Sequence, residues 1–135
     1  AAQVIVVAEG SPITGKADLN GKVASVQTGT TAESGCQDEG IEVQAFAANA
    51  DAKAALTTGK VDAWVVDNLT ALQMVEDGEG LVILNEKLTE EPYAFAFAFG
   101  SEDLVAEINK TLEKLINDGT IAGIFENYGE AYAKP

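Results

Sequence analysis

Residues 61–66 form a nearly continuous apolar run, and this run constrains the fold more than any other feature of the sequence. A strand that is apolar on both faces has to be covered on both faces, as in the parallel sheets of α/β proteins. Similar short strand-like runs recur at 3–8, 22–26, 41–46 and 81–84. Segments that suit helices separate them, at 31–37, 51–57 and 68–76. The alternation predicts an α/β fold with a largely parallel open sheet and helices on both faces.

The C-terminal third is expected to add one strand and two helices. In residues 93–99, Y-A-F-A-F-A-F, an aromatic residue occupies every second position, which predicts a strand with its aromatic face in the core. Ser101 is expected to cap a long amphipathic helix that ends at Gly119, and Thr120 to open a last helix. At 135 residues, the chain suits one α/β domain over 1–135.

Charge and composition exclude several classes of function. The net charge is −14, so phosphate backbones and anionic lipids will repel the chain, and we expect no nucleic-acid partner. The sequence contains neither histidine nor arginine, and it has one cysteine, Cys36. Without histidine, the usual general base and the commonest metal ligand are both missing. We expect no catalytic residue, no metal and no cofactor.

The start of the sequence predicts that the chain is a processed or excised piece. It begins with Ala1 rather than methionine and enters a strand-like run within two residues. No signal peptide is recognisable, and no run approaches the roughly 18 apolar residues of a membrane span.

The first candidate site follows the strand at 22–26, where the sequence reads Q-T-G-T-T over residues 27–31. Gly29 allows a tight turn or a close approach to a ligand. Thr30 or Thr31 can cap the next helix, whose free amides and dipole form an anion site. On this motif alone, a simple helix cap is the stronger interpretation.

The second candidate is Asp67, at the carboxyl end of the apolar strand. Its carboxylate can accept hydrogen bonds from an ammonium group, or Asp67 or Asn68 can cap the helix over 68–76. Ligands of open α/β sheets gather beyond the carboxyl ends of the strands. An anion site and a carboxylate at two such ends match a zwitterion and point to an α-amino acid.

Four segments resemble, in order and spacing, the polar amino-acid-binding proteins of ABC importers. They are L-N-G-K-V-A-S-V-Q-T-G-T-T-A-E (19–33), A-A-L-T-T-G-K-V-D-A-W-V-V-D (54–67), L-T-E-E-P-Y-A-F-A (88–96) and I-N-K-T-L-E-K-L-I-N-D-G-T-I-A-G-I-F-E-N-Y (108–128). The resemblance implies a periplasmic-binding-protein-like lobe. Residues 1–8 would be the first interlobe strand, 9–90 lobe 2, and 91–135 the second interlobe strand with the C-terminal helices.

The same resemblance implies the site residues and the partners. The ligand-binding residues would be Gln27, Thr28, Thr30, Thr31, Val66 and Asp67. Thr31 would hold the carboxylate of the amino acid, Asp67 its ammonium group, and Gln27 would face its side chain. Further contacts would come from a missing lobe 1. The other partners would be the importer's membrane subunits, and the location extracytoplasmic, either periplasmic or lipid-anchored.

Other interpretations stay open at this stage. Relatives of these receptors include dehydratase-like enzymes and the sensory ectodomains of membrane kinases or channels. A receiver-type phosphorylation domain would need a further acidic pair where Gln27 and Thr28 stand. Exposed aromatic residues or strand edges would favour self-association of the piece.

Overall fold

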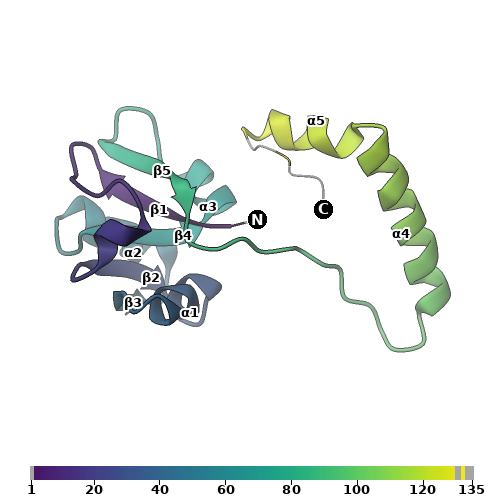
Figure 1. Cartoon of the computed structure of the whole chain (residues 1–135), viewed down its shortest axis with the longest axis horizontal. Coiled ribbons are helices and arrows are strands. Elements are labelled where there is room, and N and C mark those ends of the chain that lie inside the picture. The colour runs from purple at the N-terminus through teal and green to yellow at the C-terminus, as the bar shows by residue number, and fades with distance from the viewer. Residues whose placement is uncertain (1, 130–131, 133–135) are drawn as a thin grey trace. The chain divides into compact units, whose positions relative to one another are not determined.

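A computed structural model describes residues 2–129 and 132 of the chain (Figure 1). Its contacts divide the chain into two compact units, Ala1–Tyr93 and Ala94–Pro135. The first unit holds every strand of the described residues, and the second holds two helices. The predicted assignment of 1–8 and 91–135 to interlobe segments stays a prediction.

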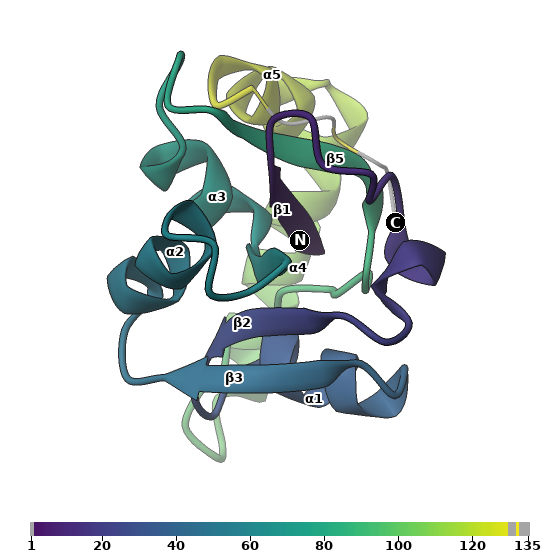
Figure 2. The ribbon, with the colours of Figure 1, turned by 90° about the vertical axis from the view of Figure 1, so that its left-hand side faces the viewer.

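The first unit is built on a five-stranded sheet with the order β3-β2-β4-β1-β5. In chain order, its strands are β1 Gln3–Ala8, β2 Val23–Gln27, β3 Glu42–Phe46, β4 Ala63–Asp67 and β5 Leu81–Lys87. β2 runs parallel to both β3 and β4, and Figure 2 shows β2 and β3 side by side. β1 pairs antiparallel with β4 and β5, so it alone opposes the shared direction of the other four strands. The predicted α/β fold is confirmed, with a mixed sheet.

Helices cover both faces of the sheet, as predicted. α1 Thr31–Asp38 covers one face, and α2 Asn49–Thr57 and α3 Asn68–Met74 cover the other. A short 3₁₀ helix, η1 Lys16–Leu19, precedes β2.

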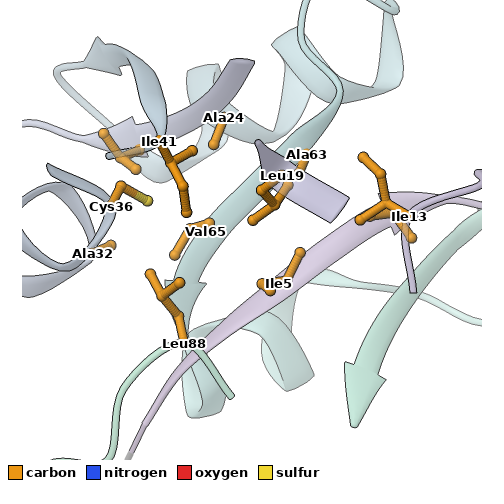
Figure 3. Packing of buried hydrophobic residues seen from close by; sticks show 12 residues of the cluster. Ile5, Ile13, Leu19, Ala24, Ala32, Cys36, Ile41, Ala63, Val65 and Leu88 are labelled. Atoms are coloured by element: carbon orange, nitrogen blue, oxygen red, sulfur yellow. The ribbon is translucent and has the colours of Figure 1, made fainter. Parts of the chain in front are cut away.

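The two central strands alternate between two buried clusters. Ile5 and Val65 point to the face under α1, where they pack with Cys36 (Figure 3). Val6 and Trp64 belong to the cluster on the opposite face, under α2 and α3. This alternation places apolar side chains on both faces of β1 and β4, as expected for covered strands.

One predicted strand is wrong. Residues 89–98 lie outside regular secondary structure, and among the described residues 93–99 pair with no strand. The aromatic side chains are also exposed rather than in the core, with Phe95 73% exposed and Phe99 fully exposed. Alternation creates an apolar face, but a strand also needs a neighbour for its backbone hydrogen bonds. In β5, by contrast, a neighbour is present: pairing with β1 extends this strand to Lys87, beyond the predicted 81–84.

The second unit contains α4 Glu102–Asn117 and α5 Thr120–Asn127, close to the predicted helices. Gly119 joins them with a φ of 83°, a left-handed conformation that favours glycine. Ser101 occupies the N-cap position but makes no side-chain capping hydrogen bond. Within residues 2–129 and 132, no helix combines the length and the apolar character needed to cross a membrane.

Candidate functional site

The sheet brings the two predicted strand ends together. β2 and β4 are parallel neighbours, so Gln27 and Asp67 close their strands at the same edge of the sheet. α1 begins four residues after Gln27, and α3 begins directly after Asp67. The edge therefore carries two helix N-termini, whose first backbone N–H groups need partners from outside the helix ladder.

Thr30 and Glu33 build a reciprocal cap at the start of α1. The Glu33 N–H donates to Thr30 Oγ1 at 3.4 Å, and Glu33 Oε2 accepts from the Gly29 N–H at 2.7 Å. Thr30 Oγ1 also donates to the Gln27 carbonyl oxygen at 2.7 Å. Gly29 has a φ of 75°, which allows the turn before the cap. Thr30 therefore shapes the loop, and its hydroxyl both donates and accepts within it.

Thr31 has different partners, which come from distant parts of the chain. Its Oγ1 accepts from Gln3 Nε2 at 2.9 Å and donates to Glu91 Oε2 at 3.2 Å. The directions follow from chemistry, because an amide NH₂ group only donates and an ionised carboxylate only accepts. The Thr31 hydroxyl hydrogen therefore points to a carboxylate.

Gln3, which lies outside the predicted site residues, fixes this orientation. Gln3 is 4% exposed, and it lies directly opposite Asp67 in the register of β1 and β4. Gln3 thus links the two strand ends, through its side chain to Thr31 and through the sheet to Asp67. The only local signal is a polar residue at the head of an otherwise apolar strand.

Asp67 uses its two carboxylate oxygens differently. Oδ1 accepts from the N–H groups of Leu69, at 2.9 Å, and Thr70, at 3.4 Å, and so caps α3. Oδ2 accepts from the Tyr93 hydroxyl at 2.5 Å. The capping interpretation of Asp67 is therefore correct for one oxygen, and the other oxygen receives a donor from outside the helix.

The remaining predicted residues support the edge in other ways. Both polar atoms of the Gln27 side chain are hydrogen-bonded. Its Nε2 donates to the Ala47 carbonyl oxygen at 3.1 Å, and its Oε1 accepts from Asn49 Nδ2 at 3.0 Å. Thr28 donates through both its N–H and its hydroxyl to the carbonyl oxygen of Phe46. The side chain of Val66 is only 3% exposed in the cluster under α2 and α3, so it offers no surface to a ligand.

Charge at this edge is negative. Glu33, Asp67 and Glu91 all contribute carboxylates to the hydrogen bonds described above. The described residues include no group of three or more Cys, Asp or Glu side chains placed to hold a metal ion. The Thr31 hydroxyl can donate to a carboxylate, and Asp67 Oδ2 can accept from a donor, so the edge has the polarity that a zwitterion requires.

Comparison with curated proteins finds relatives that bind amino acids. The chain is 30% identical over 132 residues to the ABC transporter glutamine-binding protein GlnH of Bacillus subtilis (strain 168). The matched region covers 95% of this chain and 48% of GlnH. It is 28% identical over 114 residues to the L-cystine-binding protein TcyJ of Escherichia coli (strain K12), covering 82% of this chain and 43% of TcyJ. The chain spans about half the length of these relatives. No family model matches it.

Solved structures agree with these relatives. An ancestral arginine-binding protein bound to glutamine matches with a TM-score of 0.73 and 38% identity, over 95% of this chain and 59% of that chain. Domain 2 of TmArgBP matches with a TM-score of 0.56 and 39% identity, over 60% of this chain and 91% of that chain. The fold therefore corresponds to one part of larger proteins and, over much of its length, to a domain that has been solved by itself.

Proposed function

We propose that the Thr31–Asp67 edge of this chain binds a free α-amino acid. The premise is that the chain belongs to the family of amino-acid-binding proteins of ABC transporters. Thr31 donates to the α-carboxylate of the ligand, through its hydroxyl and through the amides at the start of α1. Asp67 Oδ2 accepts from the α-ammonium group. The chain acts by binding and carries out no chemical reaction.

The proposal rests on the polarity of the two groups in this structure. The Thr31 hydroxyl already donates to a carboxylate, that of Glu91. Asp67 Oδ2 already accepts from a hydroxyl donor, that of Tyr93. An α-amino acid presents a carboxylate and a donor on neighbouring atoms, and hydrogen bonds to charged groups are stronger than neutral ones.

The other predicted residues hold this edge in place. Gln27 and Thr28 bond to the backbone around the end of β3, and Thr30 bonds back to the Gln27 carbonyl oxygen, so all three fix the loop between β2 and α1. Gln27 lies at the end of β2 and faces the side chain of the ligand. Val66 contributes through its position next to Asp67 rather than through its side chain, which is buried.

The remaining contacts with the amino acid come from a second lobe. This part of the proposal is based on the relatives, of which the chain spans about half. The complete receptor delivers its ligand to the membrane subunits of an ABC importer and works outside the cytoplasm. Because the second lobe would supply these remaining contacts, we expect the 135-residue chain alone to bind amino acids only in roughly the millimolar range. A micromolar dissociation constant by calorimetry would contradict this division of contacts.

Two substitutions test the site. Thr31→Val removes the hydroxyl, and Asp67→Asn removes the charge but keeps an oxygen that can cap α3. Losing a hydrogen bond to a charged group costs about 1.5–3 kcal/mol, so each variant should weaken binding at least about tenfold. Amide NMR titrations with L-arginine and L-glutamine measure this effect.

Matched variants serve as controls. Asp38→Asn removes the same charge at the far end of α1, and Thr57→Val removes a hydroxyl from α2. Both should bind as the unmodified chain does. Unchanged affinity of Thr31→Val and Asp67→Asn would remove this site assignment.

A further inference from the structure

We infer that residues 89–93 act as an internal competitor for the amino-acid site. The Glu91 carboxylate occupies the place of the ligand's α-carboxylate on Thr31, and the Tyr93 hydroxyl lies where its ammonium group would approach Asp67. The inference rests on the proposed function. Its consequence is that an amino acid binds by displacing a segment of the same chain.

The start of the segment is anchored on β1. The Leu88 N–H donates to the Gln3 carbonyl oxygen at 2.8 Å, and the Leu88 side chain is buried under α1. The Gln3 N–H donates to Thr89 Oγ1 at 3.1 Å. One residue of β1 therefore fixes the beginning of the segment and, through its side chain, the Thr31 hydroxyl.

This anchoring holds Glu91 in position against Thr31. Thr89 Oγ1 donates to Glu91 Oε1 at 2.9 Å, while Thr31 Oγ1 donates to Glu91 Oε2 at 3.2 Å. Both carboxylate oxygens thus have a hydroxyl donor, one from the segment itself and one from the site. A donor and its carboxylate acceptor are already in place before any ligand arrives.

Glu91 and an amino-acid carboxylate exclude each other at Thr31. A threonine hydroxyl has a single hydrogen, and Gln3 already donates to its oxygen, so Thr31 serves one carboxylate at a time. Two carboxylates at one position also repel each other, and the edge already carries Glu33 and Asp67 nearby.

Tyr93 has a weaker effect than Glu91. Asp67 Oδ2 accepts from the Tyr93 hydroxyl, but a carboxylate oxygen has a second lone pair for an ammonium hydrogen. Tyr93 therefore restricts the approach to Asp67, whereas Glu91 blocks the partner of the carboxylate outright. Residues 89–93 have no regular secondary structure, so no helix or strand is broken when they move aside.

The effect on affinity follows from the fraction of molecules in which the site is open. An apparent dissociation constant rises in inverse proportion to that fraction, so a site open about one tenth of the time binds about tenfold more weakly. Removing the Glu91 charge should therefore strengthen binding of an amino acid. Removing the Tyr93 hydroxyl should strengthen it less.

The test compares Glu91→Gln with Glu90→Gln in the whole 135-residue chain. Both variants lose one negative charge at neighbouring positions, and Glu90 is exposed. Amide NMR titration with L-glutamine should give a dissociation constant about three- to tenfold lower for Glu91→Gln than for Glu90→Gln. Tyr93→Phe should show a smaller decrease. Before any ligand is added, the amides of Thr31 and Ala32 should shift in Glu91→Gln and stay in place in Glu90→Gln.

Each other outcome overturns the inference in a recognisable way. Equal affinities in the two Gln variants would show that Glu91 does not compete, with amino-acid binding itself intact. Weaker binding by Glu91→Gln would make Glu91 a contact of the ligand. Unmoved Thr31 and Ala32 amides would show that the Glu91 contact is absent in solution. If the unmodified chain and all variants fail to bind, the proposed function falls together with the inference.

Discussion

The orientation of the Thr31 hydroxyl depends on a single buried neighbour, Gln3. Gln3 donates to it, and this leaves its hydrogen for a carboxylate. A Gln3→Leu chain would keep the size of the side chain and lose that constraint, so the hydroxyl could turn to other acceptors. In the proposed site, Gln3 is thus a positioning residue, which would act on a ligand through Thr31.

Cys36 gives a prediction at the same scale. The residue is fully buried on α1, and burial raises the pKa of its thiol to about 12. The thiolate is the reactive form, and its fraction at neutral pH falls about tenfold for each unit by which the pKa rises. We therefore expect the folded chain to resist a disulfide exchange reagent and the urea-unfolded chain to react at once. Rapid stoichiometric labelling of the folded chain would contradict the burial of Cys36.

Individual site residues could be predicted only where they follow a strand. The loop at 27–31 and Asp67 were predicted because ligands gather beyond the carboxyl ends of parallel strands, and β2 and β4 are indeed neighbours. Within that loop, only the family resemblance pointed to Thr31. Gln3, Thr89 and Glu91 were not predicted. They reach the site from β1 and from the segment after β5, and only the tertiary register of these elements brings them together.

At the scale of elements, Lys53 joins two helices on one face of the sheet. It lies on α2, and its Nζ bonds to the carboxylate of Glu79, at 2.7 Å, and to the carbonyl oxygen of Met74, the last residue of α3. A cation at the C-terminus of a helix also interacts favourably with the helix dipole. The Lys53 hydrogen bond is the main cause that lowers the pKa of Glu79 from its ordinary value of 4.5.

This link predicts how stability depends on pH. A carboxyl group with a lowered folded-state pKa stabilises the chain above its ordinary pKa, and that stabilisation is lost as the pH falls through the lowered value. Lys53→Met should lower the melting temperature at neutral pH. As the pH falls below 4.5, the melting temperature of Lys53→Met should decrease less steeply than that of the unmodified chain. Lys60→Met, which removes the charge of an exposed lysine, should leave the acid dependence unchanged. Thermal melts that show the same acid slope in both variants would argue against the link.

Elements were predicted well where their pattern and their pairing agree. The apolar run at 61–66 became the central strand β4, buried on both faces. Residues 93–99 have an equally regular pattern but form no strand, because the described residues give them no partner. Periodicity reports which side chains share a face, whereas strand formation depends on hydrogen bonds from elsewhere in the fold.

At the scale of the whole molecule, the first unit holds every part of the proposed site that this chain supplies. Every residue assigned to the amino acid, and every residue assigned to the competitor, lies within Ala1–Tyr93. The chain carries a net charge of −14, so its field favours ligands with a cationic group over dicarboxylic ones. We therefore expect charge to contribute to the selectivity of the proposed site.

The most direct test of the central claim asks whether the edge recognises both ends of an amino acid. L-arginine, agmatine, which lacks the carboxylate, and Nα-acetyl-L-arginine, which lacks the α-ammonium group, share one side chain. In amide NMR titrations, we predict that L-arginine shifts the amides at the starts of both α1 and α3 and binds most tightly. Agmatine should leave the start of α1 unshifted, and Nα-acetyl-L-arginine should leave the start of α3 unshifted. Equal binding of all three compounds, or shifts that leave the starts of both α1 and α3 in place, would contradict the zwitterion site formed by Thr31 and Asp67.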